Sequence, residues 1–276
     1  MVRLALRALD HACLNVEIKG QGPAIVAIHG FTGNLSTWDS LGEVVRSKYS
    51  MICPDMLGHG ASDAPHDPLL YDMDHTTRAL EEMLDHLAIT RVHWLGYSMG
   101  GRIALAAAIA LPERTQTLTI ESASPGLFGA EEREARIRSD ITLADQIQQR
   151  GIREFINYWE SLPLWQSQFR LPVAERERLR AQRLANNPAG LANSLLGMGT
   201  GMQPPLYHRL KTIQAPSLFI AGEEDIKFAA IARSMHQAVP GSRIKIIQES
   251  GHAVHLEQPA IFNQTVLEFL NSPQQS

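Results

Sequence analysis

The pentapeptide Gly96-Tyr97-Ser98-Met99-Gly100 connects a predicted strand, Val92–Tyr97, to a predicted helix, Met99–Leu111. A serine on such a sharp strand-to-helix turn has a strained backbone and an exposed hydroxyl, as a catalytic nucleophile requires. The turn crowds its neighbours, so glycine is favoured two positions before and two positions after the serine. A plain strand–turn–helix with an incidental serine can carry the same five residues, and the surrounding chain therefore has to decide between the two interpretations.

Short aliphatic and β-branched runs alternate with amphipathic segments along most of the chain. The predicted strands are Ala24–His29, Tyr49–Asp55, Val92–Tyr97, Thr117–Glu121, Ser217–Gly222 and Arg243–Ile247. The predicted helices are Leu41–Ser47, Asp74–Leu87, Met99–Leu111, Ala229–Val239 and Pro259–Leu270. This alternation predicts an α/β fold with a mostly parallel, doubly wound sheet that helices cover on both faces.

The alternation stops between residues 126 and 210, where no strand is predicted and Arg, Glu and Gln are frequent. Trp159, Trp165 and Phe169 are interspersed among these polar residues. We interpret residues 126–210 as a helical cap inserted into a core formed by residues 1–125 and 211–276. The last residues, Ser272–Ser276, are expected to be disordered.

A glycine-rich segment follows the predicted strand Ala24–His29. The segment is His29-Gly30-Phe31-Thr32-Gly33, and it stands where the α/β-hydrolase fold has its oxyanion loop. The backbone N–H groups of Phe31 and Met99 are therefore the candidate oxyanion donors, one from this loop and one from the residue after the serine. A glycine-rich turn with a buried His29 is the alternative interpretation.

Two segments near the C-terminus offer an acid and a base. Gly222-Glu223-Glu224-Asp225 ends a predicted strand, and Asp225 fits the Gly-x-x-Asp pattern of α/β hydrolases, which leaves Glu223 and Glu224 as loop charges. His252 follows the last predicted strand and is the candidate base. Ser98, Asp225 and His252 then occur in the chain order of an α/β-hydrolase triad. His255 is expected to pack or to form a hydrogen bond.

The composition argues against several kinds of partner. The 276 residues contain 25 Lys and Arg against 29 Asp and Glu, and a net charge of −4 gives no basic field for nucleic acid or anionic lipid. Met1–Asp10 is too short an apolar stretch for a signal peptide, and no run approaches the roughly 18 residues of a membrane span.

The cysteine content agrees with a reducing compartment, because Cys53 is interpreted as a small buried hydrophobic residue rather than as half of a disulfide. We expect a cytoplasmic protein.

Motifs for cofactors are weak or absent. Gly197-Met198-Gly199-Thr200-Gly201 lacks the final glycine of a dinucleotide fingerprint and follows no predicted strand. No group of His, Cys and carboxylate residues has the spacing of metal ligands. We therefore expect neither an organic cofactor nor a metal.

Arginines distinguish this chain from an esterase for neutral lipids. Arg102 lies four residues after Ser98 on the predicted helix, so both side chains project from one face and the guanidinium points toward the serine. A planar guanidinium suits the two-pronged recognition of a carboxylate. Residues 126–210 contain no lysine but eleven arginines, of which most should be solvated: Arg133, Arg136, Arg138, Arg150, Arg153, Arg170, Arg176, Arg178, Arg180, Arg183 and Arg209.

The chain resembles the 2-succinyl-6-hydroxy-2,4-cyclohexadiene-1-carboxylate (SHCHC) synthases over most of its length. The segments that carry the resemblance are 96–102 with Ser-Met-Gly-Gly-Arg, 125–127, 132–133, 138–140, Trp159, 163–164, 183–187, 198–204 with Met-Gly-Thr-Gly-Met-Gln-Pro, 222–228 with Asp-x-Lys-Phe, and 251–257. The serine and histidine motifs are generic to α/β hydrolases. Ser-Met-Gly-Gly-Arg, Met-Gly-Thr-Gly-Met-Gln-Pro and Asp-x-Lys-Phe are specific to the synthases.

The resemblance implies a lyase of menaquinone or phylloquinone biosynthesis, which eliminates pyruvate from a cyclohexene precursor with several carboxylates. In that family the triad removes a proton from carbon, with Ser98 relaying it to His252. The resemblance further implies that Arg102, Arg136 and Arg183 hold carboxylates, that Tyr97 and Trp159 line the pocket, and that no cofactor is used. The expected ligand is thus a small polycarboxylate.

Two other functions remain open from the residues alone. A carboxylesterase or C–C bond hydrolase would use Ser98 as a true nucleophile on the same triad. A non-catalytic ligand-binding member of the fold is the second alternative, although the presence of Ser98, Asp225 and His252 argues against it.

Overall fold

A computed structural model describes residues 1–272, so most of the predicted disordered tail lies outside the described residues. The strands within that part of the chain are β1 (Val2–Ala5), β2 (Cys13–Gly20), β3 (Ala24–Ile28), β4 (Ser50–Pro54), β5 (Val92–Tyr97), β6 (Thr115–Glu121), β7 (Ser217–Gly222) and β8 (Arg243–Ile247). The α-helices are α1 (Asp39–Val45), α2 (Met73–His86), α3 (Met99–Ala110), α4 (Ala130–Glu160), α5 (Val173–Leu184), α6 (Pro188–Met198), α7 (Ile226–Ala238), α8 (Val254–Glu257) and α9 (Pro259–Asn271). Short 3-10 helices are η1 (Arg7–Leu9), η2 (Leu35–Trp38), η3 (Pro68–Tyr71), η4 (Pro112–Arg114), η5 (Pro163–Arg170) and η6 (Tyr207–Thr212).

The strands form one sheet in the order β1-β2-β4-β3-β5-β6-β7-β8. From β4 to β8 all neighbours are parallel, and the central strands β3, β5 and β7 are buried along their whole length. Burial on both faces explains why these strands are continuous apolar runs that the sequence identifies.

The strands β1 and β2 were not predicted from the sequence. They pair antiparallel with each other, and β2 pairs antiparallel with β4. Polar and apolar residues alternate in the second half of β2, where the order is Val16-Glu17-Ile18-Lys19. A half-exposed strand of this kind lacks the long apolar run by which the buried strands were recognised.

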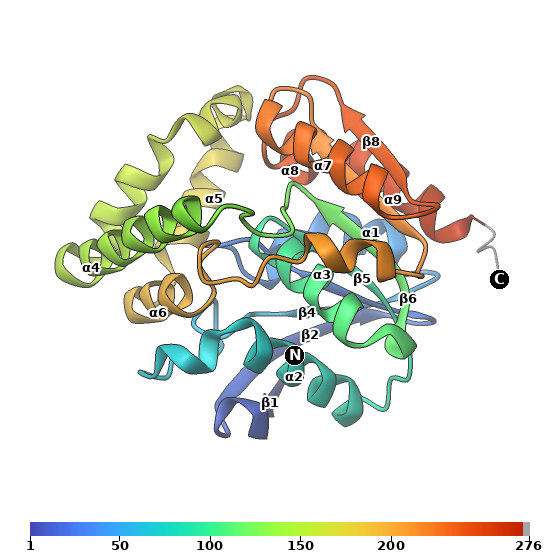
Figure 1. Ribbon diagram of the computed structural model, residues 1–276, viewed down its shortest axis with the longest axis horizontal. Helices are drawn as coiled ribbons and strands as arrows, with labels where there is room; N and C mark the ends of the chain where they lie inside the picture. The colour runs from blue at the N-terminus through green and yellow to red at the C-terminus, as the bar shows by residue number, and fades with distance from the viewer. Residues whose placement is uncertain (273–276) are drawn as a thin grey trace.

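Helices cover both faces of the sheet (Figure 1). Buried residues of α2, α3 and α7 share one apolar cluster with one face of the sheet, and those of α1 and α9 share a second cluster with the other face. The layers are therefore doubly wound, as predicted. All parallel strands end at one edge of the sheet, and the loops that follow them meet there.

The strand-to-helix turn at Ser98 is strained in the way that the sequence predicts. Ser98 has φ 52° and ψ −109°, a conformation that side-chain-bearing residues rarely adopt. A Cβ on Gly96 would lie 2.1 Å from the Gly100 carbonyl oxygen, and a Cβ on Gly100 would lie 2.1 Å from the Ile28 carbonyl oxygen. Glycine at both positions thus lets β3, β5 and α3 come together at the turn.

Helices α4, α5 and α6 gather beside the core, at the left of Figure 1. Gly151 interrupts α4 with φ 80° and ψ 172°, so the long helix bends there. Apolar residues on both arms of α4 pack against α6. Ile147 and Phe155 of α4 and Leu191 and Leu195 of α6 belong to this cluster. This helical unit lies inside the segment interpreted as the cap, whose limits at residues 126 and 210 stay a prediction.

We expect Gly96→Ala to lower the free energy of unfolding by about 1–3 kcal/mol, because the added methyl group meets backbone that cannot yield without opening the turn. The measurement is urea denaturation of the wild type and the variant. Gly42→Ala is the control: it lies in α1, its Cβ would meet only Met51 Sδ at 3.6 Å, and alanine favours a helix. Equal midpoints for wild type and Gly96→Ala would contradict the crowding at Ser98.

Candidate active site

Ser98, His252 and Asp225 form a continuous line of hydrogen bonds. His252 Nε2 lies 3.0 Å from Ser98 Oγ, and His252 Nδ1 lies 2.6 Å from Asp225 Oδ2. The other oxygen of Asp225 accepts from the Phe228 N–H at 3.2 Å and caps α7. The imidazole is almost completely buried, at 2% exposed. The three residues follow β5, β7 and β8, so a serine, a base and an acid that are far apart in the chain meet at one edge of the sheet.

The two carboxylates that precede Asp225 in the chain do not contact His252. Glu223 is exposed, and both oxygens of Glu224 accept from Arg170 at 2.9 Å. Asp225 is therefore the carboxylate of this loop that contacts the histidine, as the sequence pattern predicted.

Two residues beside Ser98 have backbone N–H groups that could bind an oxyanion. Phe31 and Met99 both line the cavity at the serine. Within residues 1–272, neither of their N–H groups donates a hydrogen bond to the protein. Such unpaired donors can bind an oxygen on which negative charge develops.

A buried histidine supports the loop that carries Phe31. His29 Nε2 accepts from the Met56 N–H at 3.0 Å, which leaves Nδ1 to donate to the Gly30 carbonyl at 2.8 Å. Burial lowers the pKa of His29 to about 4, and burial likewise lowers the pKa of the neighbouring His59 to about 3. Both rings are therefore neutral at pH 7 and act as packed, hydrogen-bonded supports.

A cavity of about 520 Å³ opens over the serine and lies between the core and the cap helices. Tyr97 and Trp159 line it, as do Phe31, Trp165 and Phe228. The charged side chains around the cavity comprise three cations, Arg102, Arg136 and Lys227, and two carboxylates, Glu132 and Asp140. The volume suits a small organic molecule, and the excess of cations favours an anionic one.

Arg102 is the most deeply placed of these cations. Its Nη1 donates to the Met198 carbonyl at 2.7 Å and to Gln203 Oε1 at 3.0 Å, which ties α3 to the segment after α6. Burial, and secondarily the charge of Arg136, lowers its pKa to about 10, so the guanidinium stays protonated at neutral pH. An anion in the cavity would relieve the cost of keeping these two positive charges close together.

Arg136 reaches the cavity from α4 and has one partner of its own. Its Nε donates to Asp140 Oδ1 at 2.8 Å, one turn further along the helix. The other oxygen of Asp140 is buried and has no hydrogen-bond partner among the described residues, and burial raises the pKa of this carboxyl. Asp140 thus orients Arg136 while offsetting part of the positive charge.

Arg183 is not among the residues that line the cavity at Ser98, and the role toward a carboxylate that the resemblance implies for it stays a prediction. Its guanidinium lies 5.2 Å from the centroid of the Trp165 ring, and it donates to Glu160 Oε1 and Gln168 Oε1, both at 3.1 Å. The long side chain from α5 is therefore held against Trp165, which itself lines the cavity.

Several residues that line the cavity were not predicted as site residues, and Trp165, Lys227 and Phe228 are among them. The Phe228 and Trp165 rings contact the His252 ring, with centroids 4.6 Å and 5.5 Å from it. Lys227 and Phe228 belong to the Asp-x-Lys-Phe segment, so their place directly after Asp225 was the signal that could have found them. Trp165 follows no strand, and only the packing of the cap brings it to the site.

Two general features concern the described part of the chain. No helix within residues 1–272 is long and apolar enough to cross a membrane. In the same part, no group of three or more His, Cys, Asp or Glu side chains is placed to hold a metal ion.

The comparison with known proteins identifies first the class and then the family. A family model described as alpha/beta hydrolase fold matches residues 23–259, and the chain is an enzyme of that fold. A Bacillus subtilis protein assigned provisionally as an SHCHC synthase is 45% identical over 92% of this chain and 94% of its own length. The SHCHC synthase of Citrobacter koseri is 33% identical over 86% of this chain and 90% of its own length. The chain belongs to the SHCHC synthase family.

A solved structure agrees with this assignment. The MenH structure from S. aureus superimposes with a TM-score of 0.89 at 36% identity, and the match covers 92% of this chain and 97% of the other. The predicted α/β-hydrolase fold and the predicted family are both confirmed.

We expect the free energy of unfolding to fall as the pH drops from 6.5 toward 4, partly through His29. Unfolded His29 takes up a proton below about pH 6.5, whereas the folded ring resists protonation until about pH 4. This difference corresponds to about 3 kcal/mol, and His29→Gln should lose that share of the pH dependence. Urea denaturation at pH 7 and pH 4.5 measures it, with the exposed His208→Gln as control. Parallel losses in wild type and His29→Gln would refute a neutral, buried His29.

Proposed function

We propose that this protein is an SHCHC synthase, a lyase that eliminates pyruvate from 2-succinyl-5-enolpyruvyl-6-hydroxy-3-cyclohexene-1-carboxylate in menaquinone or phylloquinone biosynthesis. The observation that carries the proposal is that Arg102 and Arg136 line the same cavity as the hydrogen-bonded Ser98 and His252. The names of the relatives support the same reaction.

In the proposed reaction the triad acts as a base toward carbon. Ser98 Oγ takes a proton from a ring carbon of the substrate while its own proton passes to His252 Nε2, 3.0 Å away. The electrons of the broken C–H bond form a new ring double bond, and the existing ring double bond shifts by one position toward the carbon that bears the enolpyruvyl group. The C–O bond to that group then breaks, and the group leaves with the bonding pair. Protonation of the leaving enolate gives pyruvate, and Ser98 is never acylated.

Asp225 has an electrostatic and orienting role in this proposal. Its carboxylate accepts from Nδ1 of His252 at 2.6 Å, which leaves Nε2 free of hydrogen and able to accept a proton. When His252 becomes positively charged, the buried carboxylate stabilises that charge. Asp225 therefore strengthens His252 as a base, and the carboxylate itself does not become protonated.

When the ring carbon loses its proton, negative charge develops on the substrate and has to be stabilised during the elimination. The N–H groups of Phe31 and Met99 would donate to a substrate oxygen on which this charge collects. Both donors belong to backbone held by the turns after β3 and β5, so little reorganisation is needed as the charge develops. The same two groups would serve a hydrolase, and they do not distinguish the two reactions.

The arginines favour the lyase substrate over a neutral ester. A substrate with several carboxylates would place one against Arg102 and another near Arg136, whereas Tyr97 and Trp159 would contact the ring. Each charge-assisted hydrogen bond in such a buried cavity contributes about 1.5–3 kcal/mol. Arg183 packs against Trp165 and does not line the cavity, so we propose that it supports Trp165 rather than binding a carboxylate directly.

A serine hydrolase is the second candidate function, because a serine 3.0 Å from an imidazole, with two unpaired N–H donors beside it, is also the arrangement for acyl transfer. The decisive experiment incubates the pure protein with the cyclohexene precursor and follows pyruvate. Release of pyruvate without an acylated Ser98 supports the lyase. Failure to release it, together with a burst of acyl-enzyme from activated esters, would favour the hydrolase.

We expect Ser98→Ala and His252→Ala each to lower kcat for pyruvate release by about 10²–10⁴-fold, because each removes a member of the proton relay. Asp225→Asn should also impair kcat, since an amide can select the wrong tautomer of His252. Glu223→Gln is the control and should behave as wild type, because Glu223 is exposed and does not contact His252. Near-normal turnover by Ser98→Ala would sink the assignment of the relay.

We expect Arg136→Gln to lower kcat/KM for the polycarboxylate about ten- to a hundredfold, because the variant loses a cation that lines the cavity. The thermal midpoint should fall only modestly, since glutamine can still donate a hydrogen bond to the buried Asp140. Arg102→Lys should lower both activity and the thermal midpoint, since Arg102 also holds Met198 and Gln203. Steady-state kinetics and thermal unfolding measure the two effects.

The control for the arginine variants is Arg138→Gln, which removes a cap arginine whose side chain is 70% exposed. Its kcat/KM should stay at the wild-type value. Equal losses by Arg136→Gln on the polycarboxylate and on a small neutral ester would mean that Arg136 does not recognise substrate charge.

A further inference from the structure

A second buried carboxylate holds the backbone on both sides of His252. Glu257 Oε2 accepts from the Gly251 N–H at 2.8 Å, and Glu257 Oε1 accepts from the Ala253 N–H at 3.3 Å. The side chain of Glu257 is only 4% exposed, although the residue stands at the end of the short helix α8. The carboxylate thus bridges the two peptide groups that flank the imidazole.

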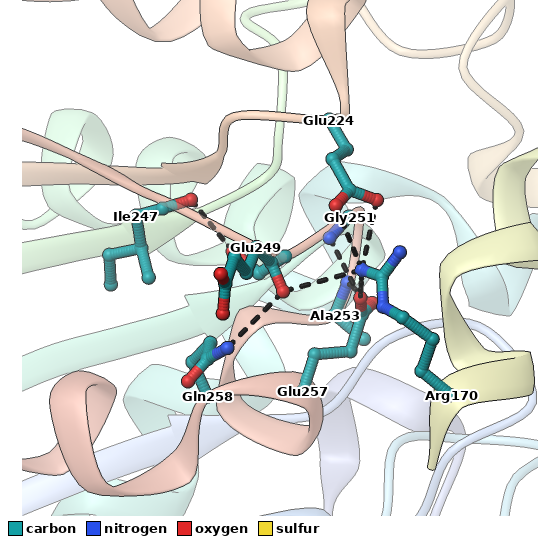
Figure 2. A network of polar contacts seen from close by, with 9 residues as sticks. Arg170, Glu224, Ile247, Glu249, Gly251, Ala253, Glu257 and Gln258 are labelled. Carbon is teal, nitrogen blue, oxygen red and sulfur yellow. Dashed lines mark hydrogen bonds and ion pairs between the residues drawn. The ribbon is translucent and has the colours of Figure 1, made fainter.

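An arginine of the cap reaches this carboxylate from the opposite side (Figure 2). Arg170, the last residue of η5, donates through Nη2 to both oxygens of Glu224 at 2.9 Å and to the Glu249 carbonyl at 3.3 Å. The same nitrogen lies 3.9 Å from Glu257 Oε2. Glu224 directly precedes Asp225, so Arg170 touches both the loop of the acid and the loop of the base.

The loop between β8 and His252 is strained and closely packed against the cap. Glu249 has φ 54°, and its carbonyl accepts from Gln258 Nε2 as well as from Arg170. A Cβ on Gly251 would lie 2.1 Å from Ser167 Oγ of η5. The histidine loop is therefore held by contacts from α8, from Gln258 and from the cap rather than by its own conformational preference.

We propose that Glu257 is a positioning residue that sets where the His252 ring lies, and that Arg170 is the link through which the cap supports both loops of the triad. This inference rests on the proposed function only in its choice of assay. Glu257 and Arg170 do not line the cavity at Ser98, so they act through His252 and Asp225 and not on the substrate.

The two contacts of Glu257 require a carboxylate. Both partners are N–H donors, and an ionised carboxylate offers an acceptor oxygen to each. A glutamine would accept from one and turn its own NH₂ toward the other, so one buried peptide group would lose its partner. A rotation of either peptide moves the imidazole relative to Ser98 Oγ and Asp225 Oδ2, and proton transfer is sensitive to such shifts.

Arg170 should contribute less than Glu257. Its side chain is 55% exposed and that of Glu224 is 41% exposed, so water and salt weaken their attraction. Its value lies in geometry, because one nitrogen meets three acceptors from two loops. Lysine can approach the same acceptors as a point charge and should retain part of the effect.

The test compares Glu257→Gln, Arg170→Gln and Arg170→Lys with the wild type. Pyruvate release gives kcat and KM, labelling of Ser98 by a serine-directed fluorophosphonate reports the triad without the substrate, and the NMR signal of the His252 Nδ1 proton reports its bond to Asp225. Arg150→Gln is the matched control, since Arg150 is a cap arginine of similar exposure, 58%, paired with Glu154 away from the triad.

We expect Glu257→Gln to lower kcat about ten- to a hundredfold, with KM within about twofold, and to slow Ser98 labelling by a similar factor. The Nδ1 proton signal should shift or broaden. Arg170→Gln should lower kcat and the labelling rate about two- to fivefold, Arg170→Lys should recover part of that loss, and Arg150→Gln should match the wild type.

Wild-type labelling by a folded Glu257→Gln variant, with an unchanged Nδ1 signal, would overturn the proposal. If Glu257→Gln does not fold, Arg170→Gln decides: a labelling rate equal to that of Arg150→Gln rejects the link. The proposed function fails separately, if the wild type releases no pyruvate although Ser98 is labelled. In that case a dependence of labelling on Glu257 still supports the positioning role.

Discussion

The backbone of Ser98 is the constraint on which the site depends. A left-handed φ of 52° at a residue with a side chain is unfavourable by itself, and it persists because β5 and α3 are packed tightly on both sides of it. Gly96 meets Gly100, and Gly100 meets the Ile28 carbonyl at the end of β3. These contacts bring the loop of Phe31 beside the serine. The Ser98 hydroxyl and the Met99 N–H therefore come from one crowded turn, and the Phe31 N–H joins them because β3 packs against that turn.

Charge is distributed very unevenly over this protein. The whole chain has a net charge of −4, yet the cavity contains three cations and two carboxylates. Burial makes the charge of Arg102 costly and the nearby charge of Arg136 adds to that cost, which Met198, Gln203 and Asp140 offset only in part. A site of this kind favours an anionic ligand, because the ligand would pair with the arginine charges that the protein only partly compensates. The hydrogen-bonded serine is general to the fold, whereas we propose that the arginines select an anionic class of substrate.

The cap contributes to the site by packing as well as by lining it. Trp159 and Trp165 form part of the cavity wall, and Trp165 also contacts the His252 ring. Arg183 packs against the Trp165 ring and donates hydrogen bonds to Glu160 and Gln168. On the other side of the histidine, Ser167 and Arg170 of η5 contact the loops that carry His252 and Asp225. The cap and the triad thus form one packed unit.

The sequence by itself determined the fold class and the residues Ser98, Asp225, His252, Phe31 and Met99 as candidates. Each of them follows a strand of the parallel part of the sheet at a short spacing, and parallel strands bring such positions to one edge of the sheet. Tertiary structure alone decided which long side chains reach the cavity. Arg136 lines it, but Arg133 and Arg138 of the same helix do not, and Arg183 packs against the ring of Trp165. It also decided that Glu257 brackets His252 and that β1 and β2 complete the sheet. Spacing fixes a position along the backbone, whereas the place of a flexible side chain depends on how the cap helices bend and pack against the core.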